Sequence, residues 1–202
     1  MRKEAKMKIE QYPNWFASAG GELNFSTHLV KFKGLKVDFV QLGAYTGDAT
    51  KWLFENILTH PESTLTDVDT WEGSNEEIHK QMDWKDVETV YNEKNSQWLD
   101  EGRLIKKKMT TDEFFALNDK QFDFVYVDAD HTAMAVLKDG LNGYASLKAN
   151  GIIAFDDYLW GVENKLDVMS IPKTALDALL IYFRKETTVL DINLQVWLKK
   201  VF

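Results

Sequence analysis

Residues 37–47 read VDFVQLGAYTG, a short apolar segment that runs directly into a glycine-containing turn. Six residues rich in Val, Phe and Leu are typical of a buried β-strand. Apolar residues then recur at helical spacing between Asp48 and Leu58. The segment therefore predicts a strand, a tight turn and a helix, which form the first unit of a parallel α/β sheet.

The same alternation of strands and helices continues along the chain. Further strands are expected at residues 63–68, from 104, and at 122–127, 152–155, 187–190 and 194–199, and helices at 84–99, 112–117, 132–147 and 173–183. Such alternation gives parallel βαβ units with helices on both faces of the sheet. We expect a doubly wound, Rossmann-like α/β fold with a mostly parallel seven-stranded sheet. Residues 1–36 lack this pattern and are expected to form an N-terminal cap segment before a domain at 37–202.

The composition narrows the classes of function. The 202 residues are 45% hydrophobic and carry a formal charge of -8, which disfavours nucleic acid as a partner because phosphate contacts need Lys and Arg. The chain has no cysteine, which excludes disulfides and Cys-ligated zinc and fits a cytoplasmic protein. No apolar run approaches the length of a membrane span, so no membrane association is expected. A homo-oligomer is compatible with the sequence.

The turn after the first strand resembles neither common phosphate-binding loop. Gly47 is followed by Asp48 rather than by the Lys-Ser/Thr of a P-loop. Ala44 and Tyr45 interrupt the Gly-x-Gly-x-x-Gly of a dinucleotide site. Two readings stay open for this turn. One is a tight strand-to-helix connection, and the other is a site where a ligand approaches the backbone closely.

Acidic residues follow the second strand. Asp67 and Asp69 lie at alternate positions, so they share a face of the strand. A carboxylate at such a strand end can accept two hydrogen bonds from a ribose diol. Either aspartate can serve, and a solvated strand end is the alternative.

Titratable residues also gather after the fourth and fifth strands, which we expect to be neighbours. The fourth ends in Asp128-Ala129-Asp130-His131 and the fifth in Asp156-Asp157. Clustered carboxylates repel one another unless a cation or a proton offsets them. Oxygen ligands without cysteine favour Mg²⁺, with Mn²⁺ or Ca²⁺ as other candidates. The competing reading is that Asp130 and Asp157 cap helices without any metal.

Taken together, these motifs resemble those of a known family. Residues 39–47 look like the first motif of class I S-adenosylmethionine-dependent methyltransferases, Glu-x-Gly-x-x-x-Gly, with Gln41 in place of Glu. Residues 69–71, 122–131 and 151–158 resemble the ends of the second, fourth and fifth strands of the group that includes catechol and sugar O-methyltransferases. The resemblance covers roughly residues 37–160.

The resemblance implies a cofactor, a metal and a base. S-adenosylmethionine is the implied cofactor, with contacts from Gln41, Gly43, Ala44, Tyr45, Gly47, Asp69, Thr110 and Asp128. Mg²⁺ or Mn²⁺ is the implied metal, with Asp128, Asp156 and Asp157 as its ligands. The implied base is His131 or Asp130. His131 is favoured because its ordinary pKa is about 6.5 against about 3.9 for aspartate, and carboxylates and a cation shift it in opposite directions.

The function expected is O-methylation of a small-molecule hydroxyl, on a sugar or a catechol-like diol, assisted by a divalent metal. One alternative is a methyltransferase that needs no metal. Another is a non-catalytic module that binds the cofactor. Recognition of the acceptor is expected in residues 1–36, 72–100 and 158–172, which carry the weakest patterns.

Overall fold

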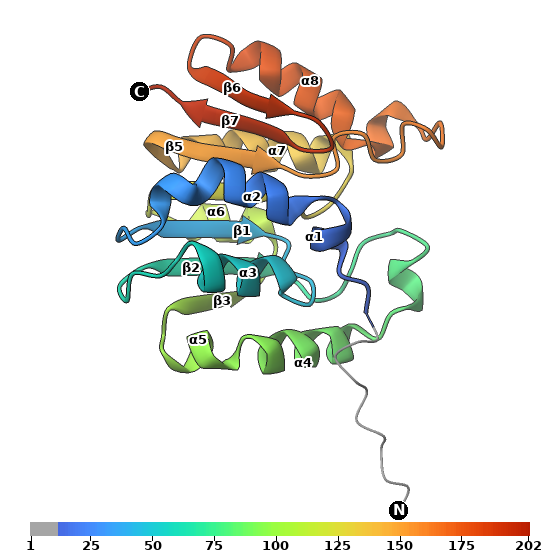
Figure 1. The fold of residues 1–202 in the computed structure, drawn as a ribbon. Helices are drawn as coiled ribbons and strands as arrows, with labels where there is room; N and C mark the ends of the chain where they lie inside the picture. Colours follow the sequence, from blue (N-terminus) through green and yellow to red (C-terminus); the bar gives the residue numbers. More distant parts are fainter. Residues whose placement is uncertain (1–11) are drawn as a thin grey trace, which may run out of the picture.

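The computed structural model describes residues 12–202 and contains one seven-stranded sheet in the order β3-β2-β1-β4-β5-β7-β6 (Figure 1). The strands are β1 (Asp38–Leu42), β2 (Thr64–Asp69), β3 (Leu104–Lys108), β4 (Phe122–Val127), β5 (Leu147–Phe155), β6 (Thr187–Ile192) and β7 (Val196–Lys200). Only the pairs that involve β7 are antiparallel. The doubly wound, mostly parallel sheet predicted from the sequence is confirmed.

Helices cover both faces of this sheet. The α-helices are α1 (Trp15–Ser18), α2 (Gly21–Leu29), α3 (Asp48–Asn56), α4 (Trp84–Lys94), α5 (Ser96–Asp100), α6 (Thr111–Leu117), α7 (Ala133–Ala145) and α8 (Pro172–Tyr182). Helices α1, α2 and α3 lie in front of the sheet in Figure 1, and α6 and α7 lie behind it. Helix α8 packs against α7, where Gly140 leaves room for the side chain of Leu179.

The strands supply side chains to two separate cores because successive residues point to opposite faces. Phe124 and Tyr126 of β4 belong to the core beneath α2 and α3. Val125 and Val127, which alternate with them, belong to the core beneath α7 and α8. Burial on both faces explains why these strands are almost continuously apolar in sequence.

The N-terminal segment contributes a helix to the first of these cores. Phe25 of α2 is fully buried. Its ring centroid lies 5.0 Å from that of Tyr126, 5.5 Å from that of Trp197 and 5.7 Å from that of Phe124. Nδ2 of Asn24 donates a hydrogen bond to Oε1 of Gln195 at 2.8 Å. The part of the cap segment that is described therefore packs on the sheet itself, and residues 1–11 lie outside the description.

Two elements differ from the expected bounds by more than two residues. The helix expected at residues 84–99 divides into α4 and α5 at Asn95, whose side chain donates to the carbonyl oxygens of Tyr91 and Gly47. A side chain that bonds backbone carbonyls competes with continuation of the helix. The strand expected at 152–155 begins earlier, at Leu147, and its pairing with β4 is irregular before Ile152.

The lysine-rich strand β3 forms one edge of the sheet. Nζ of Lys106 lies 2.6 Å from a carboxylate oxygen of Glu88 on α4 and 4.3 Å from the ring centroid of Trp71. Charged residues on an edge strand oppose pairing with another sheet.

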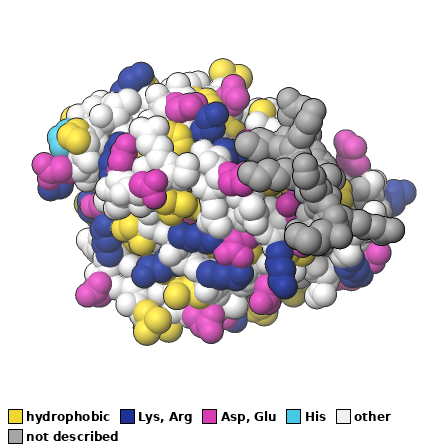
Figure 2. Space-filling view, turned by 90° about the horizontal axis from the view of Figure 1, so that it is seen from below, with side chains coloured by type: hydrophobic (Ala, Val, Ile, Leu, Met, Phe, Trp, Pro, Cys, Tyr) yellow, Lys and Arg dark blue, Asp and Glu magenta, His cyan; other side chains and the backbone are white. Residues whose placement is uncertain are grey.

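Figure 2 shows Lys, Arg, Asp and Glu side chains interspersed on the face seen from below. Among residues 12–202, no helix is both long and apolar enough to span a membrane.

Strand order reverses between β1 and β4, which defines where a ligand would bind. In open α/β sheets, ligands bind outside the carboxyl ends of the strands at this switch point. The turn at residues 43–47 follows β1, and Asp128 follows β4. The topology therefore brings the predicted cofactor loop and the predicted acidic cluster to the same place.

Candidate active site

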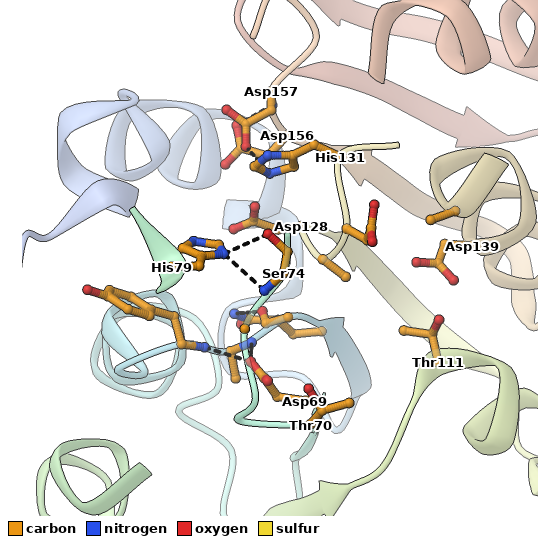
Figure 3. Close-up of a pocket in the computed structure, with 18 of the residues that line it drawn as sticks. Asp69, Thr70, Ser74, His79, Thr111, Asp128, His131, Asp139, Asp156 and Asp157 are labelled. Carbon is orange, nitrogen blue, oxygen red and sulfur yellow. Dashed lines mark hydrogen bonds and ion pairs between the residues drawn. The ribbon is translucent and has the colours of Figure 1, made fainter. Parts of the chain in front are cut away.

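A cavity of about 810 Å³ lies at the carboxyl ends of β1, β2, β4 and β5 (Figure 3). Its lining includes most of the residues singled out from the sequence, namely Gln41, Gly43, Ala44, Tyr45, Asp69, Thr110, Asp128, Asp130, His131, Asp156 and Asp157. Gly47 lies at the base of the same loop, as the residue before α3. A cavity of this size suits a nucleoside-sized ligand together with a small second molecule.

The two glycines of the first turn are required by packing within the protein. Gly43 has φ +83°, and a Cβ atom there would lie 1.8 Å from the carbonyl oxygen of Asp128. Gly47 has φ +76°, and a Cβ atom would lie 2.1 Å from Nδ2 of Asn95. Both positions lie in the left-handed region that favours glycine. A bulky residue at 43 would thus separate β1 from β4 before it met any ligand.

Asp69 and Asp67 occupy different environments, although both side chains lie on one face of β2. Asp69 lines the cavity, and its Oδ2 accepts hydrogen bonds from the backbone N–H groups of Ala44 (2.8 Å) and Tyr45 (3.0 Å). Asp67 is fully buried and accepts hydrogen bonds from the hydroxyls of Thr50 and Tyr91. Of the two aspartates, only Asp69 faces the cavity and can reach a ribose.

Gln41 offers an acceptor that no described residue uses. Its Nε2 donates to the carbonyl oxygen of Gly43 at 2.8 Å, which fixes the orientation of the amide. Its Oε1 is buried and has no hydrogen-bond partner among residues 12–202. A buried acceptor without a partner is unfavourable, so this oxygen fits a ligand that supplies an N–H or O–H donor.

Thr110 lies at the start of α6 and forms a capping box. Its hydroxyl accepts from the backbone N–H of Glu113, while the Glu113 carboxylate accepts from the backbone N–H of Thr110. Asp139 of α7 faces Thr111 on this side of the cavity (Figure 3). Burial raises the pKa of Asp139 to about 6, although the Thr111 hydroxyl opposes the shift. No pattern of residues pointed to Asp139, because it lies inside a helix.

Three side chains converge at the far end of the cavity. Asp128, His131 and Asp157 each place a ligand atom within 4.8 Å of the others. The pKa of Asp128 is raised well above its usual range because the carboxyl is buried and because Asp156 and Asp157 lie beside it. Figure 3 shows the imidazole of His131 next to Asp157 and above Asp128. Ionised carboxylates at this position repel one another, so the cluster favours a proton or a cation there.

Asp156 lies behind this group and is bonded to the protein. Its Oδ2 accepts a hydrogen bond from the Tyr126 hydroxyl, and its Oδ1 accepts from the backbone N–H of Asp157 at 2.9 Å. Burial and the charge of Asp157 raise the pKa of Asp156 to about 6. Asp157 has φ +59°, an uncommon conformation for a residue other than glycine. Asp156 and the strained backbone together aim the Asp157 carboxylate at His131.

His131 is flanked by a carboxylate at each ring nitrogen. Its Nε2 lies 2.9 Å from Oδ2 of Asp157, and its Nδ1 lies 3.0 Å from Oε1 of Glu76. Burial lowers the pKa of His131, but these two carboxylates more than offset that effect and raise it to about 11. The value differs from the near-neutral one expected from sequence, because Glu76 belongs to a segment without periodicity and was not identified.

Asp130 lies at the exposed rim of the cavity. Its Oδ1 accepts a hydrogen bond from the backbone N–H of Thr132 at 2.7 Å. Thr132 is itself the N-cap of α7, since its hydroxyl accepts from the backbone N–H of Ala135. Asp130 therefore organises the turn that precedes the helix.

Aromatic side chains from two of the weakly patterned segments form one wall of the cavity. Trp15 stacks on Tyr45 with ring centroids 4.5 Å apart, and His79 lies between Trp15 and Trp84. Trp160, from the third of these segments, packs against His131 at 4.7 Å. The segments expected to recognise an acceptor all reach this cavity.

Comparison with known proteins identifies a family and several structural neighbours. The family model described as a methyltransferase domain matches residues 40–158. No curated protein matches the sequence. The O-methyltransferase TomG from Streptomyces achromogenes, involved in tomaymycin synthesis and solved with S-adenosylmethionine, has a TM-score of 0.63 at 9% identity, covering 95% of this chain and 92% of that chain.

Two further neighbours were solved with S-adenosylhomocysteine. An O-methyltransferase from Bacillus cereus has a TM-score of 0.58 at 10% identity, covering 96% of this chain and 84% of that chain. The mycinamycin-pathway methyltransferase MycE, in complex with Mg, S-adenosylhomocysteine and mycinamycin VI, has a TM-score of 0.61 at 14% identity, covering 95% of this chain and 55% of that chain. At these identities the neighbours show a shared fold.

Proposed function

The chain belongs to the methyltransferase-domain family, as a class I S-adenosylmethionine-dependent methyltransferase, and we propose that it methylates a hydroxyl group of a small molecule with the help of a divalent cation. The observation that carries this proposal is one cavity with two chemically different ends. The turn at residues 43–47 and Asp69 line one end, and the cluster of Asp128, His131 and Asp157 lines the other. Methyl transfer requires an acceptor oxygen aligned with the activated methyl group, which such a cavity can arrange.

The cofactor end has groups of the right chemistry for S-adenosylmethionine. Asp69 uses its oxygens to hold the turn, but each carboxylate oxygen can accept more than one hydrogen bond. Ribose hydroxyls can therefore bind to it. The unpartnered Oε1 of Gln41 would accept a hydrogen bond from the cofactor's amino group. When bound, the cofactor supplies an electrophilic methyl group, and the protein supplies its position.

The donor set at the other end fits a divalent cation. Asp128 and Asp157 offer carboxylate oxygens within 4.8 Å of each other, and the imidazole of His131 lies beside them. Carboxylates suit Mg²⁺ and Mn²⁺. A divalent cation held there would orient the acceptor hydroxyl and lower its pKa. The charge would also relieve the repulsion that raises the pKa of Asp128. Asp156 would then support the ligands from behind.

His131 is the proposed proton acceptor. Two flanking carboxylates keep its ring protonated, so it accepts a proton only when the Asp157 carboxylate is engaged elsewhere. Coordination of Asp157 would satisfy that condition. Asp130 is the rival base, but its carboxylate is exposed and already bonded to the backbone N–H of Thr132.

The aromatic wall of the cavity favours a small acceptor molecule with an apolar face that can pack against it.

Turnover with a panel of sugars and catechol-like diols tests the proposal. Release of S-adenosylhomocysteine is measured with Mg²⁺ or Mn²⁺ and again with EDTA. We expect metal-dependent release with at least one hydroxyl compound. His131→Ala should lower the single-turnover rate by about 100-fold, the usual scale for a lost general base.

His60→Ala is the matched control, because His60 lies in a turn outside the cavity. An unchanged rate in His131→Ala with a collapsed rate in Asp130→Ala would transfer the role of base to Asp130. Turnover that EDTA leaves intact would favour transfer without a metal. Cofactor binding with no transfer to any hydroxyl compound would favour a non-catalytic module.

A further inference from the structure

Asp139 is a buried carboxyl group that takes no part in the proposed methyl transfer. It lies on the inward face of α7, in a buried stripe that it shares with Ala133, Val136, Gly140 and Gly143. Only 2% of the residue is exposed, yet it lines the cavity. An acidic side chain in an otherwise apolar stripe is unfavourable unless a partner compensates it.

The carboxylate of Asp139 has acceptor capacity that the protein leaves free. Within residues 12–202, the side chain that hydrogen-bonds to it is Thr111, whose hydroxyl lies at the start of α6. An ionised carboxylate can accept about four hydrogen bonds. A buried carboxylate with so few donors fits a ligand that brings an N–H group of its own.

The other carboxylates on this side of the cavity already have donors. Asp112, at the start of α6, accepts from Nζ of Lys138 at 2.8 Å, and its side chain is 57% exposed. Asp130 accepts from the backbone N–H of Thr132. Asp139 is therefore the carboxylate on this side that is both buried and open to a further donor.

This side of the cavity is where the base of the cofactor would lie. Asp69, at the end of β2, is the proposed acceptor for the ribose hydroxyls. The base and the sulfonium arm leave a ribose from opposite ends, and the sulfonium arm must point to the acidic cluster where the acceptor binds. In Figure 3, Asp139 lies across the cavity from His79, which belongs to the aromatic wall. The base is thereby directed towards α6 and α7.

The lining beside Asp139 suits a flat heterocycle. Met109, Met134 and Ala135 line the cavity together with Asp139 and Thr111. Apolar side chains can cover the faces of a ring, while a carboxylate can bond to its edge. Once adenine is attached to a ribose, its 6-amino group is its only N–H donor. A buried acceptor is therefore matched to that one group.

We propose that Asp139 recognises the base of the cofactor by accepting a hydrogen bond from the 6-amino group of adenine. This inference rests on the proposed function and adds a specificity-determining residue to it. The Thr111 hydroxyl, by donating to the same carboxylate, keeps it oriented. The contact is remote from the reacting atoms, so Asp139 contributes to binding rather than to the chemical step.

Calorimetry with two probes tests the contact without any turnover. The probes are S-adenosylhomocysteine and its derivative in which hydrogen replaces the 6-amino group. They are compared at pH 8, where a carboxyl with a pKa of about 6 is ionised. Wild type should bind S-adenosylhomocysteine about 10- to 100-fold more tightly, because the derivative leaves the buried carboxylate without a donor. In Asp139→Ala the two affinities should agree within about 3-fold, because neither probe then meets a buried acceptor.

Two further variants complete the comparison. Asp139→Asn keeps an acceptor oxygen and should retain part of the preference. Asp112→Ala is the matched control, because it removes a neighbouring carboxylate that is exposed and paired with Lys138, and it should keep the full preference.

Two results would overturn the inference while leaving cofactor binding intact. One is equal affinity of wild type for the two probes, and the other is an undiminished preference in Asp139→Ala. If wild type binds neither probe, the cofactor of the proposed function is refuted, and the role of Asp139 is refuted with it.

Discussion

Replacing Asp67 by asparagine should remove a specific part of the pH dependence of stability. Asp67 is fully buried beneath the cofactor turn, and its Oδ2 accepts hydrogen bonds from the hydroxyls of Thr50 on α3 and Tyr91 on α4. Its Oδ1 has no hydrogen-bond partner among the described residues. Burial raises the pKa of Asp67 to about 7, although the two hydroxyls oppose the shift. An asparagine keeps the acceptor and cannot ionise.

The sign and size follow from the two pKa values. Between its ordinary value of 3.8 and about 7, the carboxyl holds more protons in the folded state than in the unfolded state. The free energy of unfolding therefore falls as the pH rises through this window. The whole effect is about 4 kcal/mol, because each pH unit corresponds to about 1.4 kcal/mol. About 3 kcal/mol of it lies between pH 5 and pH 8.

Urea unfolding followed by tryptophan fluorescence at pH 5, 6, 7 and 8 measures this effect. Relative to wild type, Asp67→Asn should gain about 3 kcal/mol in the free energy of unfolding from pH 5 to pH 8. Asp119→Asn removes an exposed carboxylate, and its free energy of unfolding should change with pH in the same way as that of wild type. If the free energy of unfolding of Asp67→Asn also follows wild type across this pH range, ionisation of the buried Asp67 carboxylate does not destabilise the folded state.

Two further predictions concern the ligand sites. Asp69→Ala should weaken S-adenosylmethionine binding by at least about 10-fold, or about 1.4 kcal/mol, because it removes both a ribose acceptor and the bonds that hold the turn. Asp69→Asn should lose less affinity. Equal affinities of Asp69→Ala and wild type, measured by calorimetry, would exclude a role for this carboxylate. Mn²⁺ at about 100 times its dissociation constant should stabilise wild type by about 2.7 kcal/mol, or roughly 5–10 °C in thermal melting. Asp157→Asn should abolish this shift in melting temperature, and Asp130→Asn should keep it. If millimolar Mn²⁺ does not change the melting temperature of wild type, the metal-free alternative is favoured.

The sequence by itself determined the order of the elements and the end of the sheet at which the site lies. Short, almost continuously apolar runs define β1 and β4, and the glycines at 43 and 47 mark the turn after β1. These signals are local, since they depend on the composition of a short segment and on the backbone freedom of glycine. Parallel topology then places every strand end on one edge, so the aspartates at those ends were predicted to lie together.

Only the tertiary structure decided which of these side chains meet, and in what charge state. Asp67 and Asp69 are equivalent by alternation, yet packing of α3 and α4 buries one and leaves the other at the cavity. Glu76 reaches His131 along a loop without periodicity, and its charge keeps the imidazole protonated. Such contacts depend on the path of a loop and on the packing of distant elements, which no local pattern of residues encodes.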